Sequence, residues 1–178
     1  KTPSGPIHIG FGRELIYCGV LDRILQDKGR QTEFLFFIDD FDSLKNFPPN
    51  IPKDFTKHKE YLGKPLYTIP CPYDHCDSYA EHYSTELINT FPHFGIRPKI
   101  LRTHKVYQTS DMKNLIRIAL DNVESLRNIL VEIISTTFQE TQHENFLKEM
   151  STWYPAMVVC QKCGRLKSTT VTSWEAAT

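Results

Sequence analysis

Along the first hundred residues, apolar positions alternate between the spacing of a helix and the density of a buried strand. Residues 11–28 carry apolar side chains at helical spacing, and Gly29 suits the C-terminal stop. Residues 32–38 (TEFLFFI) form a near-continuous apolar run, which predicts a strand buried on both faces of a parallel sheet. A turn, a helix and such a strand make up half of a doubly wound nucleotide-binding fold.

The later pattern predicts a proline-rich insertion followed by further helices and a strand. Residues 46–76 are too long for a simple connector, so we expect an insertion with a short helix near 54–62. Ser78 predicts the N-cap of a helix over 78–91, because Glu81 lies at capping-box spacing. Residues 98–107 predict a strand, and a long helix starts at 110 or 111 and keeps helical spacing to Ile133. Residues 136–151 are polar with a weak helical pattern.

Composition is that of a soluble globular protein, with 178 residues of which 40% are hydrophobic and 24% charged. Lys plus Arg and Asp plus Glu both number 21, which argues against a generic polyanion binder. Five cysteines, an odd number, argue against a disulfide framework and favour a reducing cytoplasm. No apolar run reaches the length of a membrane span. Because Lys1 stands immediately before a motif that should follow a strand, we expect the true start to lie upstream.

The stretch from Thr2 to Gly10 (TPSGPIHIG) is the strongest candidate for chemistry. A Gly-rich turn before a helix leaves backbone N–H groups unpaired, and with the helix dipole these suit a phosphate. Gly5 and Gly10 lack a Cβ, so a ligand can approach the backbone closely. His8 adds a donor that can carry charge near neutral pH. On spacing alone, a tight turn with a surface His8 explains the pattern equally well.

Three carboxylates, Asp39, Asp40 and Asp42, follow the buried strand directly. In open parallel sheets ligands bind at this edge, so these residues could hold a cationic group or a metal. The alternative is turn chemistry, in which Asp is common.

Cys160 and Cys163 form a C-x-x-C-G turn, which is half of a tetrahedral zinc site. Cys71, His75 and Cys76 could supply the other ligands. We favour a second pair beyond the end of the chain, because residues 168–174 have the pattern of a strand in an unfinished ribbon. Two unliganded cysteines in a loop remain the alternative.

The amino-acid sequences of these motifs resemble those of class I aminoacyl-tRNA synthetases. TPSGPIHIG resembles their first signature, and most closely that of class I lysyl-tRNA synthetases. The segments DDFD (39–42), EYLGKPL (60–66) and CDSYAEHY (76–83) resemble the same family in the same order, as does WYPAMVVC (153–160). The usual signature ends in a second His or in Asn, whereas Phe11 stands here and can donate no hydrogen bond.

The resemblance implies an α/β fold, a partial Rossmann-like (HUP-type) nucleotide-binding fold with a mostly helical insertion and the start of a zinc-ribbon-like segment. Residues 1–110 would form the first half of the catalytic fold. Residues 111–178 would form the helical connecting insertion and an incomplete zinc-binding segment. The family's second, Lys-rich signature and its anticodon-binding region are absent from this sequence, so we expect a fragment that is inactive alone.

The implied activity is that of a lysine–tRNA ligase in the cytoplasm, with ATP, Mg²⁺, a structural Zn²⁺, lysine and tRNA(Lys) as partners and cofactors, and no membrane. His8 would be catalytic. The implied ATP-binding residues are Pro3, Ser4, Gly5, His8 and Gly10. The implied lysine-binding residues are Thr2, Asp39, Asp40, Asp42, Tyr79, Glu81 and His82, and the metal ligands are Cys160 and Cys163.

Three alternatives stay open at this point. One is another class I synthetase or a related nucleotidyltransferase, against which the DDFD, EYLGKPL and SYAEH segments count. Another is a zinc-ribbon binding module with a degenerate nucleotide fold. The third concerns the basic run between Arg97 and Arg117, which is either a solvated face or a contact for tRNA phosphates.

Overall fold

A computed structural model describes residues 1–135 and 140–175 of the chain, which fold into two compact units. The first unit comprises residues 1–106 and 163–166, and the second comprises residues 107–162 and 167–178. The described residues include no helix that is both long enough and apolar enough to span a membrane.

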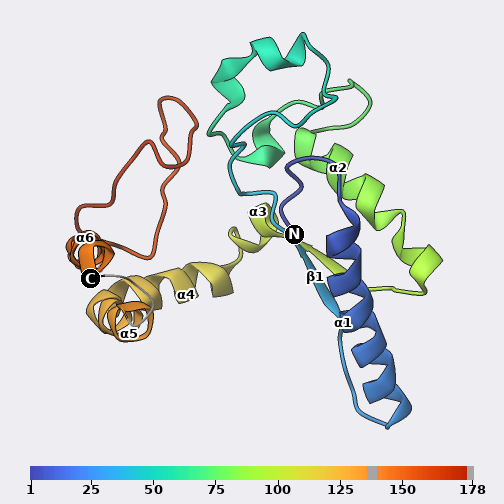
Figure 1. Ribbon diagram of the computed structural model, residues 1–178, viewed down its shortest axis with the longest axis horizontal. Coiled ribbons are helices and arrows are strands. Elements are labelled where there is room, and N and C mark those ends of the chain that lie inside the picture. The colour runs from blue at the N-terminus through green and yellow to red at the C-terminus, as the bar shows by residue number, and fades with distance from the viewer. Residues whose placement is uncertain (136–139, 176–178) are drawn as a thin grey trace. The chain divides into compact units, whose positions relative to one another are not determined.

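The first unit is built on helix α1 (Ile9–Asp27) and two parallel strands, β1 (Leu35–Ile38) and β2 (Lys99–Arg102). The register pairs Leu35 with Lys99 and Ile38 with Arg102, so both strands end at the same edge of the sheet. Helix α1 runs alongside β1 (Figure 1). The predicted helix over 11–28 is confirmed with a start two residues earlier, and both predicted strands are present but shorter.

Strand β1 is buried on one face only, so the prediction of burial on both faces was wrong. Phe36 and Ile38 are buried, whereas Leu35 and Phe37 are 39% and 44% exposed. The apolar run reflects side chains that alternate between the two faces of a strand. In the described residues only the face towards α1 is covered.

The proline-rich insertion, residues 46–76, contains 3₁₀ turns rather than a regular α-helix. The short helix expected near 54–62 takes the form of η1 (Phe55–Lys57) and η2 (Lys59–Tyr61), and η3 (Leu66–Thr68) follows. Such short turns suit a stretch in which prolines interrupt helical hydrogen bonding.

Helix α2 (Tyr79–Ile88) packs against both hydrophobic clusters of the first unit. The predicted cap is confirmed, because the Ser78 hydroxyl accepts a hydrogen bond from the Glu81 N–H at 3.1 Å. A left-handed Gly95 ends the turn η4 (Phe91–Phe94), after which the chain enters β2. One cluster joins α1, β1 and α2 through Leu15, Phe36, Ile38, Leu87, Phe91 and Ile96. The other joins the insertion to α2 through Leu44, Ile51, Leu66, Ile69, Tyr79, Ala80 and Tyr83.

The second unit contains α4 (Ser110–Asp121), α5 (Val123–Ser135) and α6 (Glu140–Met150). The single long helix predicted from residue 110 is therefore broken at Asn122, whose side-chain amide donates to the Ile118 carbonyl. Helix α6 confirms the weak pattern over 136–151, of which residues 136–139 lie outside the described residues. The structure assigns no strand to residues 168–174, so the predicted ribbon strand was wrong there; a strand requires a pairing partner.

Candidate functional site

The signature loop, residues 2–10, is held in place by contacts with the insertion and with α2. Pro3 is fully buried. A Cβ added to Gly5 would lie 3.0 Å from the Pro48 Cβ, so only glycine fits there without a shift. The Tyr79 hydroxyl donates to the Ser4 carbonyl at 2.9 Å. These contacts fix the backbone of residues 2–8, which precede α1 and have no regular secondary structure.

His8 is the exposed N-cap residue of α1, and its side chain makes no capping hydrogen bond. A Cβ on Gly10 would lie 3.0 Å from His8 Nδ1, so the imidazole lies close over the start of the helix. Phe11 instead turns towards the core, where its ring lies 5.9 Å from that of Phe36. Phe11 thus contributes packing where the usual signature has a polar side chain.

Asp39 and Asp40 directly follow β1, and Thr103 and His104 begin helix α3 (Thr103–Val106) directly after β2. The Thr103 hydroxyl lies within hydrogen-bond distance of both carboxylates, at 3.2 Å from Asp39 and 3.1 Å from Asp40. The Thr2 hydroxyl lies 3.5 Å from the other oxygen of Asp39. These contacts connect the signature loop to the carboxyl ends of both strands.

Asp40 is completely buried and is satisfied by the protein itself. Its carboxylate accepts hydrogen bonds from the His104 backbone N–H at 2.9 Å and lies 2.6 Å from His104 Nδ1. The Tyr67 ring stacks on the His104 imidazole at 4.6 Å between centroids. A buried carboxylate and a stacked ring together fix the imidazole in one orientation.

Glu81 and Asp40 line one cavity of about 240 Å³, so the structure brings the DDFD and SYAEH segments together. Glu81 forms an ion pair with Arg102, which also lies 3.8 Å from Asp40. The cavity is bounded by Asp40, Tyr67, Asp77, Ser78, Glu81, Arg102, His104 and Lys105. Three carboxylates and three basic side chains give this cavity a mixed, strongly polar lining.

The four predicted lysine-binding carboxylates differ in how far the protein already pairs them. Asp40 contacts His104, Glu81 pairs with Arg102, and Asp42 lies 3.6 Å from Lys45. Asp39 contacts the hydroxyls of Thr2 and Thr103. Within the described ranges no cationic side chain pairs with it, although the main-chain ammonium of Lys1 interacts with it electrostatically. Asp39 therefore retains the most capacity to accept a cationic ligand.

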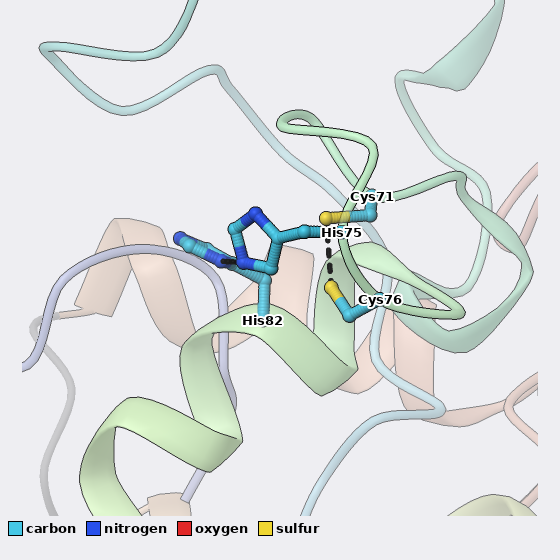
Figure 2. Close-up of side chains that lie close together, drawn as sticks. All are labelled: Cys71, His75, Cys76 and His82. Atoms are coloured by element: carbon cyan, nitrogen blue, oxygen red, sulfur yellow. Dashed lines mark hydrogen bonds between the residues drawn. The ribbon is translucent and has the colours of Figure 1, made fainter.

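A second group of side chains, Cys71, His75, Cys76 and His82, forms a candidate metal centre (Figure 2). Their four ligand atoms lie within 4.8 Å of one another. The Cys76 thiol donates to Cys71 Sγ at 2.7 Å, and His82 Nδ1 lies 3.1 Å from His75 Nε2. Two sulfur and two imidazole donors are the ligand set of a closed, tetrahedral zinc site.

The surroundings of the cluster shift the pKa of three of its side chains, Cys71, Cys76 and His82. Burial lowers the pKa of His82, and Glu86, 3.5 Å from its Nε2, opposes that effect. Burial opposes ionisation of Cys71, but hydrogen bonds from Cys76 and from backbone N–H groups lower its pKa overall. Burial, and then the hydrogen bond with Cys71, raise the pKa of Cys76 to about 12. The lowered pKa values of His82 and Cys71 favour neutral imidazole and thiolate, which are the forms that bind metal, whereas the raised pKa of Cys76 favours its protonated thiol.

The structure places several predicted residues away from a ligand-binding surface. Tyr79 is fully buried, and His82 lies in the Cys/His cluster. Cys160, which is half-buried, belongs to the second unit, and Cys163, which is exposed, belongs to the first. Neither is among the groups of three or more possible ligands found in the described part of the chain.

Sequence reasoning missed Arg102, Thr103 and His104, which complete the sheet edge. No positional signal in the sequence marked them, because the predicted strand ran on to residue 107, whereas β2 ends at Arg102 and so brings these residues to the edge beside DDFD. For His82, the signal was its spacing after Cys71, His75 and Cys76, whereas the resemblance implied that it binds lysine.

Comparison with known proteins identifies the family of this chain. The sequence profile of the family described as tRNA synthetases class I (K) matches residues 1–178. The chain is 33% identical over 174 residues to the lysine–tRNA ligase of Methanosarcina barkeri and 34% identical over 174 residues to that of Treponema pallidum (strain Nichols). A lysine–tRNA ligase of Methanocaldococcus jannaschii is 33% identical over 167 residues.

The alignments cover 98% of this chain for the first two relatives and 94% for the third. They cover 30%, 31% and 29% of the relatives' own lengths, so the chain spans about a third of each. The family profile nonetheless matches every residue, including the signature loop and the sheet edge. The chain therefore belongs to the class I tRNA synthetase family whose amino acid is lysine, K.

Proposed function

We propose that this chain forms the first part of the catalytic domain of a lysine–tRNA ligase, with a Rossmann-like, HUP-type core. The protein would use ATP to convert lysine to lysyl-adenylate and pyrophosphate, and would then transfer lysine to tRNA(Lys). The observation that carries this proposal is the hydrogen-bonded connection from Thr2 through Asp39 to Thr103. It joins the loop suited to phosphate with a carboxylate suited to an ammonium group. The three relatives compared above are all named lysine–tRNA ligases, which supports lysine as the amino acid that the protein activates.

In the first step, an oxygen of the lysine carboxylate attacks the α-phosphorus of ATP, and the bond to the departing pyrophosphate breaks. No proton needs to move, so the protein contributes positioning and charge stabilisation. Pro3, Ser4, Gly5 and Gly10 would shape the ATP site, with backbone N–H groups directed at the phosphates. His8, exposed at the start of α1, would donate to the phosphates as charge develops. Mg²⁺ would accompany ATP.

Lysine would be bound at the sheet edge, with one ammonium group opposite Asp39 and the Thr2 hydroxyl beside it. An ammonium group is costly to bury unpaired, and Asp39 is half-buried with hydroxyl groups as its hydrogen-bonding partners. Asp40 would act on this site indirectly by holding His104 and the strand ends in place. Asp42 and Glu81 remain candidates for the second ammonium group, although both have basic partners.

We also propose that the cluster of Cys71, His75, Cys76 and His82 holds Zn²⁺. Four protein ligands leave no open position for a substrate, so the ion would be structural, linking the proline-rich loop to α2. His82 is therefore assigned to the metal rather than to lysine. Cys160 and Cys163 stay proposed ligands of a separate zinc site.

The test is pyrophosphate exchange into ATP with each amino acid in turn, using the full-length protein that carries these residues. Lysine should support exchange far better than any other amino acid, and a second assay should show charging of tRNA(Lys). Exchange that depends on a different amino acid would identify another class I synthetase. An absence of exchange and of ATP binding would favour a non-catalytic module.

A further inference from the structure

Tyr79 connects α2 to the signature loop although 75 residues separate it from Ser4. Its side chain is fully buried, and its hydroxyl donates to the Ser4 carbonyl at 2.9 Å. Burial also raises the pKa of Tyr79, so the hydroxyl keeps its proton and remains a donor. Through this hydrogen bond, helix α2 holds the peptide group between Ser4 and Gly5 in the signature loop.

The peptide group that Tyr79 anchors is also the one that carries the Gly5 N–H. The Ser4 carbonyl and the Gly5 N–H belong to one planar unit and point in opposite directions. Fixing the carbonyl therefore fixes the direction of the N–H. Gly5 is one of the residues proposed to shape the ATP site, so the Tyr79 hydrogen bond orients a donor in that site.

Tyr79 is in turn held between ligands of the Cys/His cluster. Cys76 precedes it by three residues, and its thiol lies 3.5 Å from the Ser78 carbonyl. His82 follows it by three residues, and the His82 N–H donates to that same carbonyl at 3.1 Å. The Tyr79 N–H donates to the Ile69 carbonyl at 2.8 Å, two residues before Cys71. The segments that flank Tyr79 thus belong to the proposed metal site.

We propose that Tyr79 is a positioning residue for ATP binding and transmits the state of the Cys71–His75–Cys76–His82 cluster to the Ser4–Gly5 peptide. This inference rests on the proposed ATP and zinc sites. The resemblance of the sequence implied that Tyr79 binds lysine. Tyr79 instead has a role in ATP binding. Metal binding would hold residues 71–82 in the geometry that aims the tyrosine hydroxyl at Ser4.

Tyr79→Phe in the full-length protein removes this hydroxyl and keeps the ring. It should raise KM for ATP in pyrophosphate exchange about three- to tenfold, the effect of one hydrogen bond, with KM for lysine unchanged. Tyr61→Phe is the matched control. Its ring also packs on Phe55, at 5.2 Å, but its hydroxyl makes no hydrogen bond in the described part of the chain. An unchanged KM for ATP in a folded Tyr79→Phe variant would overturn the proposal.

The coupling to the metal is tested by calorimetry with a non-hydrolysable ATP analogue, before and after removal of zinc with a chelator. Chelation should weaken binding severalfold in the wild type and in Tyr61→Phe, but add little in Tyr79→Phe. Equal weakening in all three proteins would mean that the cluster acts by another route. Failure of the proposed function is distinguishable, because it would appear as the absence of lysine-dependent exchange in the wild type.

Hydrogen–deuterium exchange on the wild type keeps the proposal testable if Tyr79→Phe does not fold. Removal of zinc should increase deuterium uptake in a peptide covering residues 2–10, while uptake in the C-terminal half of α1 stays constant. Unchanged uptake in residues 2–10 would contradict the transmission from the cluster to the loop.

Discussion

The carboxylate of Asp40 and the imidazole of His104, 64 residues apart in sequence, lie 2.6 Å apart and join the carboxyl ends of β1 and β2. Asp40 is completely buried, so this contact is shielded from solvent. A charge-assisted contact in such a position contributes more than one at the surface. The pair therefore belongs to the framework of the site rather than to its ligand-binding surface.

Asp40→Asn should accordingly lower stability more than it changes substrate selection. Loss of the charged acceptor should reduce the free energy of unfolding by about 1–3 kcal/mol. Urea denaturation of the full-length protein measures this effect. Asp54→Asn is a suitable control, because Asp54 lies at the surface in an exposed pair with Lys57 and should change stability by less than about 0.5 kcal/mol. Equal changes in the free energy of unfolding for the two substitutions would contradict a structural role for Asp40.

Asp39→Asn should raise KM for lysine about 10- to 100-fold and change KM for ATP little. The expected size is that of a lost hydrogen bond between charged groups. Exchange assays with each substrate varied separately provide the measurement. Asp42→Asn, in the same segment but paired with Lys45, should have a smaller effect. A larger effect at Asp42 would move the lysine site to that residue.

His8→Ala should lower kcat for adenylate formation by about 100-fold or more, as for removal of one donor to a developing charge. Lysine binding, measured by calorimetry, should stay within a factor of two or three. His93→Ala tests for general effects of losing a histidine, since His93 lies in η4, away from the signature loop in the chain. Activity of His8→Ala close to that of the wild type would leave His8 as a turn residue only.

Cys71→Ser should remove one zinc ion per protein, because the remaining three ligands no longer complete a tetrahedral site. Elemental analysis of the purified full-length protein gives the ratio of zinc ions to protein molecules. Cys18→Ser, which changes an exposed cysteine of α1 outside the cluster, should leave that ratio unchanged. Zinc content that is identical in all three proteins would exclude the cluster as a zinc site.

Cys160→Ser tests the second metal site independently. If Cys160 and Cys163 bind zinc with ligands elsewhere in the full-length protein, this substitution should lower the zinc ratio by one further ion. The double variant Cys71→Ser, Cys160→Ser should then contain no zinc. A ratio unaffected by Cys160→Ser would leave these cysteines unliganded.

Features that depend on neighbouring residues were predictable from the sequence. The Ser78 cap needs only the hydroxyl and an N–H three residues later, and the positions of the two strands follow from the local patterns over 32–38 and 98–107. The break at Asn122 was not predictable, because apolar spacing continues across it and the interruption lies in the backbone. The exposed face of β1 was also missed, since an apolar run does not say how much of it the rest of the chain covers.

The candidate site likewise has a part that could be predicted from local sequence and a part that could not. The loop and the three aspartates were found because each is a local motif, whereas the pairing of Asp40 with His104 joins residues that no short pattern relates. The family resemblance assigned His82 to lysine, and the sequence did not show which side chains surround it in the folded chain. Only the folded insertion brings Cys71 and His75 to that helix.

Helix α2 contributes Leu87 to one hydrophobic cluster and Tyr79, Ala80 and Tyr83 to the other. Neither cluster can lose its packing without releasing a face of this shared helix, so the insertion and the nucleotide-binding half should unfold cooperatively, in a single transition. The insertion therefore cannot be removed without destabilising the rest of the unit. Deleting it would strip α2 of half its packing, and grafting it alone onto another protein would leave the opposite face of the helix bare.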